Sequence, residues 1–400
     1  MRRRNFIQKM SGGAAAVMLS NPLFSASLDW NSSDRELETH IIEKLTVRKV
    51  RINYPRYVGK NAIRGNHGWG YDETVCELTT NKGATGWGVV LWGHSEKEVA
   101  AYVEGKKVSD LFAPGVGLTD SKAAFCDVAL HDLAGKILNK PVYKLMGADK
   151  PEIVPCYSGM IYFDDLTPFY NKALGTDIIL KECQFDYDLG YRQFKLKIGR
   201  GNKWMPKEAG IRRDIEVTKL VAAAFPDCDI LVDGNDGYPV DEFERYLKGI
   251  EGINLFWIEE PFRETIEDYK KLKLILEDRG ISTLLADGEA GPDQVFLRHL
   301  EEQKLIDVHL TDIQDLGFTG WRKIMPELKK MDILASPHAW GAQLKTNAVA
   351  HLAGAYGNTV TIEGVTCVSD DIDFGTYHLD DGKLIPSDAP GFGMEILKRK

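Results

Sequence analysis

The stretch Phe194-Lys195-Leu196-Lys197-Ile198-Gly199 places two lysines one residue apart within an apolar run. Its aromatic and β-branched residues favour a β-strand, in which side chains alternate between two faces. Lys195 and Lys197 therefore share one face, and the apolar residues occupy the other. Neighbouring ammonium groups repel each other, which lowers the lysine pKa in a poorly solvated site and suits a general base. Two solvated lysines on an edge strand are the alternative, and the residues downstream decide against it.

The composition is that of a soluble globular protein. The chain has 400 residues, of which 44% are hydrophobic and 27% charged, with room for two hydrophobic cores. The net charge is −9, and no basic cluster follows the first residues, which argues against nucleic acid and anionic membrane surfaces as partners. The six cysteines lack metal-binding spacing and are predicted to be core residues or free thiols. No apolar run long enough for a membrane span follows the N-terminal segment.

The first 27 residues differ from the rest of the chain. An arginine pair opens the segment Arg3-Arg4-Asn5-Phe6-Ile7-Gln8-Lys9, a short apolar run covers residues 12–19, and Phe24-Ser25-Ala26-Ser27 offers small residues for cleavage. This order resembles a twin-arginine signal peptide, a resemblance that implies export of an already folded protein to the periplasm. A frayed basic terminus is the alternative. Residues 1–27 are therefore left out of the fold.

Residues 28–150 are predicted to form an α+β domain. A strand is expected over residues 44–53 and a hairpin over residues 74–91. Helical periodicity follows, in a segment that begins near the capping residues at Thr119 and ends before Pro141.

A long loop, residues 54–72, is predicted within this domain. Loops of this length in compact domains are often lids, and this one mixes aromatic and cationic side chains with four glycines. We therefore expect Arg64, His67, Trp69 and Tyr71 to contact the substrate. Several side chains of the loop suit hydroxyl groups better than an apolar ring, namely Arg56, Lys60, Asn61, Arg64, Asn66 and His67.

Residues 151–364 alternate short apolar runs with helical patterns. Eight such runs are candidate strands, at residues 153–158, 193–198, 229–233, 255–259, 283–286, 308–311, 333–336 and 360–362. Strands that alternate with helices predict an α/β fold, here a modified TIM (β/α) barrel of parallel strands. The last segment, residues 365–400, is rich in Asp, Gly and Pro and is expected to return to the first domain.

The later candidate strands all end in polar residues. The residues in question are Asp233, Glu259, Glu289, Asp312, His338 and Glu363, spaced 23 to 36 positions apart from Lys197 onward. In a parallel barrel the carboxyl ends of the strands form one rim, so these side chains are expected to converge with the two lysines. One such carboxylate alone would more often be a helix cap or a loop residue. Six polar residues at successive strand ends predict a functional site.

Three of these carboxylates, Asp233, Glu259 and Glu289, follow consecutive strands and are predicted to bind a divalent cation. A set of oxygen ligands without Cys or His suits Mg²⁺. Glu260 points away from Glu259 in an extended segment and is expected to support the ligands. Asp287, two residues before Glu289, remains a rival for the third ligand.

Mg²⁺ beside a lysine indicates removal of a proton from the carbon next to a carboxylate. The enediolate so formed carries negative charge on its oxygens, and a Lewis acid stabilises that charge as it develops. Lys197 is the predicted base. His338 is predicted to be a second acid/base across the barrel, because the Asp312 carboxylate would fix its tautomer and raise its basicity. Glu363 is expected to hold a remaining oxygen of the ligand.

These motifs together resemble the enolase superfamily, and within it the mandelate racemase group. The matches are Lys195-Leu196-Lys197, Asp233-Gly234-Asn235, Ile258-Glu259-Glu260-Pro261, Gly288-Glu289 and the Asp312/His338 pair, and in the first domain residues 83–88, 129–136 and 141–147. The resemblance extends over residues 44–390. It implies that residues 28–150 and 365–400 form a capping domain over the barrel, that one Mg²⁺ is bound, and that Lys195 neutralises the substrate carboxylate.

The resemblance implies a small-molecule carboxylate as substrate, and a homo-oligomer is expected. We predict dehydration of a sugar acid to a 2-keto-3-deoxy acid, in which Lys197 or His338 takes the α-proton and His338 protonates the departing β-hydroxyl. Racemisation, epimerisation or cycloisomerisation by the same two bases is the alternative. A non-catalytic periplasmic acid-binding protein is a further alternative, which predicts a missing base or ligand.

Overall fold

The first domain is built on an antiparallel sheet of β1 (Ile42–Val58), β2 (Gly68–Thr80) and β3 (Thr85–Val89). The computed structural model describes residues 35–397, apart from 170 and 290, so the predicted signal peptide lies outside the described residues. Helix α6 (Asp127–Ile137) lies directly on β3, because Gly86 carries no side chain there. A Cβ at Gly86 would come within 2.3 Å of the backbone nitrogen of Leu133.

The other elements of this domain are short. They are α3 (Arg35–Glu38), α4 (Glu96–Val103), α5 (Val108–Leu111), β4 (Phe112–Ala113), β5 (Gly117–Leu118), the 3₁₀ helix η1 (Ser121–Cys126) and α7 (Val142–Leu145). With α6 they enclose an apolar core of their own, centred on Leu130, Leu133 and Phe112. This core packs against the three-stranded sheet, and the hairpin formed by β1 and β2 extends from that sheet.

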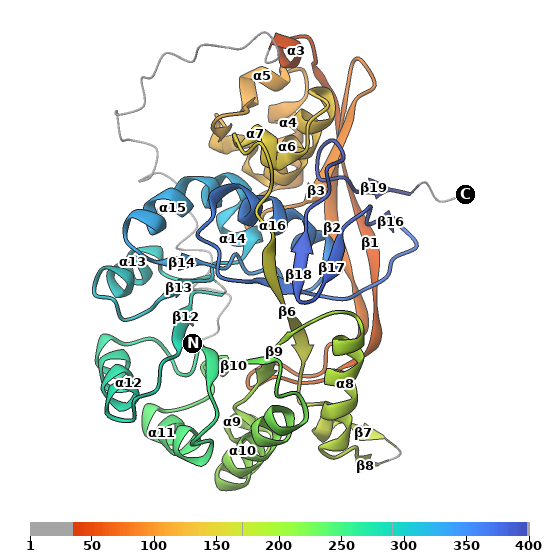
Figure 1. Cartoon of the computed structure of the whole chain (residues 1–400). Coiled ribbons are helices and arrows are strands. Elements are labelled where there is room, and N and C mark those ends of the chain that lie inside the picture. Colours follow the sequence, from red (N-terminus) through yellow and green to blue (C-terminus); the bar gives the residue numbers. More distant parts are fainter. Residues whose placement is uncertain (1–34, 170, 290, 398–400) are drawn as a thin grey trace.

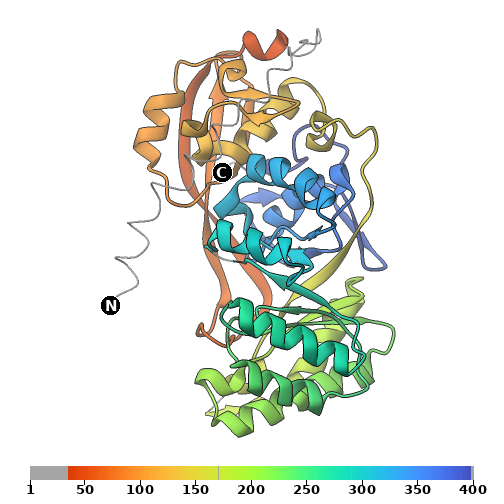
Figure 2. The same cartoon turned by 90° about the vertical axis from the view of Figure 1, so that its left-hand side faces the viewer.

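The predicted loop 54–72 is mostly strand. β1 continues to Val58 and β2 begins at Gly68, so the two strands form a long hairpin in which only residues 59–67 lie outside the strands. The glycines suggested a loop, but the strands continue through this segment, and Pro55 is tolerated because β1 is the edge of its sheet, where a proline leaves no sheet hydrogen bond unmade. The hairpin runs from the first domain along one side of the barrel, as Figures 1 and 2 show. Its tip therefore lies against the second domain.

The second domain is a closed barrel of eight parallel strands. They are β6 (Val154–Ile161), β9 (Gln193–Lys197), β10 (Asp229–Asp233), β11 (Leu255–Glu259), β12 (Leu284–Asp287), β13 (Val308–His309), β14 (Leu334–Ala335) and β15 (Ile362–Gly364). β15 pairs with β6, and a bridge between Ala335 and Thr359 closes the ring. The α/β fold predicted from the sequence is confirmed.

Helices connect the strands on the outside of the barrel (Figure 1). The long ones are α8 (Asp177–Asp188), α10 (Lys207–Ala224), α11 (Val240–Gly249), α12 (Ile266–Asp278), α13 (Gln294–Glu302), α15 (Phe318–Lys330) and α16 (Gln343–Tyr356). Shorter connecting elements are η2 (Asp164–Leu166), β7 (Pro168–Phe169), β8 (Lys172–Ala173), α9 (Arg200–Lys203) and α14 (Ile313–Leu316). Inside the barrel, Tyr157, Leu231, Trp257, Ala286, Val308 and Leu310 form an apolar cluster. Leu231 and Trp257 precede Asp233 and Glu259 by two residues on the same strand faces, so this cluster underlies the polar rim.

After β15 come β16 (Ile372–Asp373), β17 (His378–Asp380), β18 (Lys383–Ile385) and β19 (Glu395–Ile396). β17 and β18 form a hairpin that pairs with β6 of the barrel, and the chain around β19 returns to the first domain. The Trp87 indole donates a hydrogen bond to the carbonyl of Met394 (3.1 Å), and Asp132 of α6 accepts one from the backbone N–H of Phe392 (2.9 Å). The two ends of the described chain therefore hold one domain together.

A buried arginine supports the loop that follows Lys197. Arg200 is 1% exposed, and its guanidinium lies 2.7 Å from carboxylate oxygens of both Asp165 and Asp214. Removal of the Arg200 guanidinium would deprive two buried carboxylates of this counter-ion, which costs about 3–5 kcal/mol of folding stability. We therefore expect Arg200→Met to lower the free energy of unfolding by about that amount, measured by urea denaturation.

The matched control is Arg245→Met, which breaks an exposed pair with Glu208 and should leave the unfolding midpoint nearly unchanged. Equal midpoints for the wild type and Arg200→Met would contradict the role assigned to Arg200.

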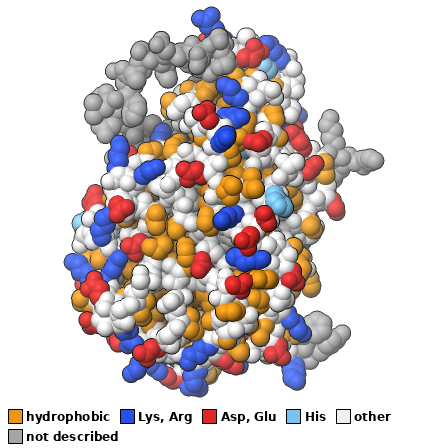
Figure 3. Space-filling view, viewed as in Figure 1, with side chains coloured by type: hydrophobic (Ala, Val, Ile, Leu, Met, Phe, Trp, Pro, Cys, Tyr) orange, Lys and Arg blue, Asp and Glu red, His pale blue; other side chains and the backbone are white. Residues whose placement is uncertain are grey.

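The surface carries mixed charge. Lys and Arg side chains are interspersed with Asp and Glu over the face shown in Figure 3. All six cysteines are free thiols, as predicted. Within residues 35–397, none of the described helices combines the length and apolar character needed to cross a bilayer.

Candidate active site

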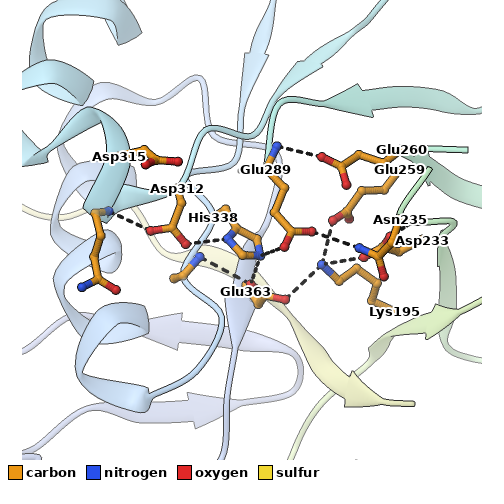
Figure 4. A network of polar contacts seen from close by, with 12 residues as sticks. Lys195, Asp233, Asn235, Glu259, Glu260, Glu289, Asp312, Asp315, His338 and Glu363 are labelled. Atoms are coloured by element: carbon orange, nitrogen blue, oxygen red, sulfur yellow. Dashed lines mark hydrogen bonds and ion pairs between the residues drawn. The ribbon is translucent and has the colours of Figure 1, made fainter. Parts of the chain in front are cut away.

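Eight polar side chains meet at the carboxyl ends of the barrel strands, and Figure 4 shows most of them pointing toward one another. Lys195 and Lys197 belong to β9, Asp233 to β10, Glu259 to β11 and Glu363 to β15, whereas Glu289, Asp312 and His338 follow β12, β13 and β14. The alternation of β9 directs both lysines inward, where they are 1% and 3% exposed. The structure thus brings together every residue that the sequence predicted as catalytic or metal-ligating.

Three carboxylates form a cluster suited to a divalent cation. One oxygen from each of Asp233, Glu259 and Glu289 lies within 4.8 Å of the other two. A second oxygen of Glu259 and the amide oxygen of Asn235 are buried without a hydrogen-bond partner. Like charges at this separation repel each other, and buried oxygens without partners are costly. A hard cation with oxygen ligands, such as Mg²⁺, satisfies both requirements.

The rival third ligand, Asp287, faces elsewhere. Its carboxylate accepts hydrogen bonds from the Tyr269 hydroxyl and from the Gly288 backbone N–H (2.6 Å). The positive φ of Gly288 (105°) turns the chain, so that Glu289 enters the cluster instead. Glu260 accepts a hydrogen bond from the backbone N–H of Glu289 (3.0 Å), which fixes the ligand from behind.

His338 and Asp312 form a hydrogen-bonded pair. The Nδ1 atom of His338 lies 2.7 Å from Oδ2 of Asp312, whose other oxygen accepts from the backbone N–H of Gln314 (2.7 Å). Because Asp312 engages Nδ1, the Nε2 atom is presented to the site. There it lies 3.2 Å from Glu363 and 3.6 Å from Glu289. Burial opposes the charged imidazolium, but these three carboxylates raise the pKa of His338 to about 9.

Residues 179–400 match the model of the family described as "Enolase C-terminal domain-like", which covers more than half of the chain. The chain belongs to this family. The capping-type first domain precedes the matched segment, which contains the site residues from β9 to β15. The enolase superfamily predicted from the motifs is confirmed.

Relatives of this enolase-family protein have known activities. A galacturonate dehydratase variant from Geobacillus sp., solved with Mg, is 29% identical, with a TM-score of 0.82 over 90% of this chain and 93% of that one. Arabinonate dehydratase of Saccharolobus solfataricus is 25% identical over 68% of each chain. L-Ala-D/L-Glu epimerase of Clostridium acetobutylicum is 25% identical over 70% of this chain and 73% of its own. An enzyme of the dehydratase or epimerase kind is therefore confirmed.

The surroundings of the two lysines differ from those predicted from the sequence, because carboxylates as well as the neighbouring ammonium group lie beside each lysine. Lys195 lies 2.9 Å from Glu259 and 3.0 Å from Glu363, and Lys197 contacts Asp233. Burial and the ammonium of Lys195 lower the pKa of Lys197, but Asp233, Glu289 and Glu259 together outweigh them, and the pKa of Lys197 lies above its ordinary value. Repulsion between the lysines is thus not enough to produce a neutral base. A cation held by the same carboxylates would offset their field at Lys197.

The raised pKa of His338 predicts a pH dependence of the enolase-family reaction. The rate of a step that requires protonated His338 is expected to decline as the pH rises through the pKa of His338. A bound cation would share the negative charge of Glu289, so this pKa is expected at or below about 9. Asp312→Asn removes a stabilising anion and should move this limb of the kcat profile to lower pH by about one unit or more.

The matched control for this profile is Asp315→Asn, an exposed aspartate that accepts from the backbone N–H of Gly291. It should move the limb far less. An Asp312→Asn profile that coincides with the wild-type profile would contradict the pairing.

A pocket of about 350 Å³ opens above the site. It is lined by Tyr54, Arg64, His67, Tyr71, Glu73, Trp92, Glu289, Asp312, Gln314, His338, Trp340, Gly341 and Lys345. A larger hollow of about 570 Å³ lies beside α13, but none of the eight polar residues of the site lines it. The smaller pocket is therefore the candidate substrate site, because it alone of the two is lined by a predicted cation ligand, Glu289, and by Asp312 and His338.

The hairpin contributes three of its four predicted contacts to this pocket. Arg64, His67 and Tyr71 line it, but Trp69 is 62% exposed and packs edge-on against Tyr57. The prediction for Trp69 is wrong. The register of β1 against β2 shifts here, and the neighbouring glycines have positive φ, so side-chain alternation does not carry through to Trp69.

The side chains that suggested hydroxyl binding are also only partly in the pocket. Arg56 forms a two-pronged ion pair with buried Asp186, with both N···O distances 2.7 Å, and the Lys60 ammonium lies over the Trp204 ring. These residues hold the hairpin on the barrel. Of the six side chains, Arg64 and His67 line the pocket.

Sequence reasoning missed several lining residues, among them Glu73, Gln314, Trp340 and Lys345. Alternation in a strand could have found Glu73, two residues after Tyr71. Lys345 lies on α16, where it donates to Gln314 (3.1 Å) and lies 3.6 Å from Asp312. Nothing in its local sequence marks it as a pocket residue, since only the packing of α16 places it there.

Proposed function

We propose that this protein dehydrates a sugar acid to a 2-keto-3-deoxy acid, with Mg²⁺ as cofactor. One observation carries the proposal: buried Lys197 and His338 approach the carboxylate cluster from strands that lie nearly opposite each other in the barrel. Two acid/base groups on opposite sides of one carbon can remove a proton and assist a leaving group. The dehydratases among the relatives support the same reaction class.

The first step is transfer of the α-proton to the Nζ atom of Lys197. The electron pair of the broken C–H bond forms the double bond of an enediolate, whose two oxygens carry the charge. Mg²⁺ held by Asp233, Glu259 and Glu289 would supply Lewis acidity to those oxygens. Lys195, whose ammonium contacts Glu259 and Glu363, adds a fixed positive charge on the same side.

The second step expels the β-hydroxyl. The enediolate electrons return to form the Cα–Cβ double bond while the C–O bond breaks, and His338 donates its Nε2 proton so that water leaves. The enol product then takes its keto form. His338 is suited to this role because its raised pKa keeps the proton available at neutral pH.

A single incubation tests the reaction. The protein is mixed with Mg²⁺ and a panel of sugar acids in deuterated water, and 2-keto acids and α-deuterium are measured together. The proposal predicts a 2-keto acid with at least one member of the panel. Deuterium incorporation with inversion and no keto acid would instead establish the epimerase alternative, which uses the same two bases without a leaving group.

We also propose that the first 27 residues export the folded protein to the periplasm. The support is the arginine pair followed by a short apolar run. Replacement of Arg3 and Arg4 by lysine is expected to keep the protein in the cytoplasm, as measured by cell fractionation. Unchanged periplasmic accumulation would overturn the proposal.

A further inference from the structure

One buried carboxylate in the pocket has no part in the reaction proposed above. Glu73 lies on β2, is 7% exposed and lines the pocket together with Tyr54 and Tyr71. Trp340 and Gly341, which follow His338, line the same pocket. Glu73 therefore faces a bound acid on a wall formed by the first domain.

Glu73 makes two hydrogen bonds within the protein. One oxygen accepts from the Tyr71 hydroxyl (2.7 Å) and the other from the backbone N–H of Thr74 (2.9 Å). Within the described residues, no Lys, Arg or His lies within ion-pair distance of it. A carboxylate offers about four acceptor positions, so two remain for a ligand. A buried carboxylate without a cation is costly unless donors reach it.

The cations of the pocket act elsewhere. Lys345 is occupied by Asp312 and Gln314. Arg64 lowers the pKa values of His67 and Glu289, so its charge is felt at the cation-binding end, whereas Glu73 raises the pKa values of Tyr54 and Tyr71 on the hairpin wall. Glu73 therefore lies on the wall that the hairpin forms, whereas the predicted cation ligands belong to the barrel.

The wall that carries Glu73 is rigid. Tyr54 donates a hydrogen bond to the carbonyl of Gly341 (3.1 Å), and Tyr71 lies so close to Gly341 that a Cβ there would come within 2.6 Å of its hydroxyl oxygen. Glu73 thus cannot turn away without releasing Tyr71. A ligand must accommodate the carboxylate where it stands.

We propose that Glu73 accepts hydrogen bonds from hydroxyl groups at the end of the substrate remote from the reacting carboxylate, and that it excludes acids with a second carboxylate at that end. This inference rests on the proposed function. The substrate class is then sugar monoacids rather than diacids. Like charges held together in a poorly solvated pocket are disfavoured strongly enough for discrimination on the order of 10²-fold.

The test compares matched acids that differ only in the remote group, such as galactonate and galactarate, across a panel of such pairs. For the wild type we expect a preference in kcat/KM of about 10²-fold for the monoacid. Glu73→Gln should lower kcat/KM for the monoacid by about tenfold or more and reduce the preference by at least as much. Glu73→Asp, which keeps the charge, should retain the exclusion of the diacid.

The control is Glu77→Gln, on the same strand but paired with Arg48 (3.1 Å), which should change neither value. Tyr71→Phe distinguishes a structural role of the hydrogen bond between Tyr71 and Glu73 from an effect of the Glu73 charge, because it removes the hydrogen bond and keeps the charge. If Tyr71→Phe abolished the preference for monoacids as Glu73→Gln is expected to do, packing rather than charge would be responsible, and the inference would be overturned.

Binding measurements separate this inference from the proposed reaction. Affinities for the same acids are measured by calorimetry in the presence of Mg²⁺, whether or not the acids turn over. A monoacid preference in binding that Glu73→Gln removes supports the inference even if no acid is dehydrated. Turnover with a preference for diacids, or a ratio unchanged in Glu73→Gln, overturns the inference and leaves the reaction standing. Absence of binding by every acid overturns both.

Discussion

Lys197→Met is expected to lower kcat by about 10³- to 10⁴-fold, because it removes the group that accepts the α-proton. Methionine fills nearly the same volume without a titratable nitrogen. The α-proton of a carboxylate is weakly acidic, and no other described base lies on the inner face of β9, since Lys195 is held between Glu259 and Glu363. Binding of the acid should persist, since Lys195 and the three carboxylates remain.

The measurement is the rate of α-proton exchange in deuterated water together with calorimetric affinity for the acid. Lys207→Met, which removes an exposed lysine paired with Glu242, serves as the control and should behave as the wild type. Exchange by Lys197→Met at the wild-type rate would show that His338 is the base and would remove the basis of the proposed first step.

The second large effect concerns the cation. Chelation of divalent ions is expected to abolish turnover, and Mg²⁺ to restore it, because three carboxylates, two of them buried and one partly buried, place oxygens within 4.8 Å of one another and require a positive charge between them. Glu259→Gln removes one of three anionic ligands and should weaken Mg²⁺ binding by about 100-fold or more. Calorimetric titration of metal-free protein with Mg²⁺ measures this directly.

Thermal unfolding provides an independent readout of the same variant. Burial and the charge of Asp233 raise the pKa of Glu259 to about 8. In the absence of cation, therefore, Glu259 makes the folded state progressively less stable as the pH rises from the ordinary carboxyl pKa of 4.5 to about 8, and neutral glutamine relieves that cost. The unfolding temperature of the wild type should rise on addition of Mg²⁺, and that of Glu259→Gln should not. A gain of equal size in both proteins would place the cation elsewhere.

The barrel could be predicted from the sequence because its signals are local. Apolar runs of strand length recur with helical segments between them, and each later run ends in a polar residue. Closure of a parallel barrel brings all carboxyl ends of its strands to one rim, so positions far apart in sequence could be grouped without coordinates. The same reasoning found the cation ligands and the dyad of Asp312 and His338.

The hairpin was harder to predict because its structure depends on partners distant in sequence. Four glycines among aromatic and cationic residues suggested a long loop, yet pairing of β1 with β2 extends the strands on both sides of residues 59–67. Contacts of Arg56 with Asp186 and of Trp204 with the carbonyl of Asn61 (2.6 Å) then fix the hairpin on the barrel. Neither partner could be identified from the hairpin's own residues.

The sequence by itself determined the order and type of the barrel strands, the face that Lys195 and Lys197 share, and the set of carboxylates able to hold a divalent ion. These features follow from the two-residue alternation of a strand and from the common direction of parallel strands. The tertiary structure alone decided that Glu289 rather than Asp287 joins the cluster, that Trp69 faces outward, and that Lys345 lines the pocket. These outcomes depend on backbone turns and on packing between distant segments, which local periodicity does not encode.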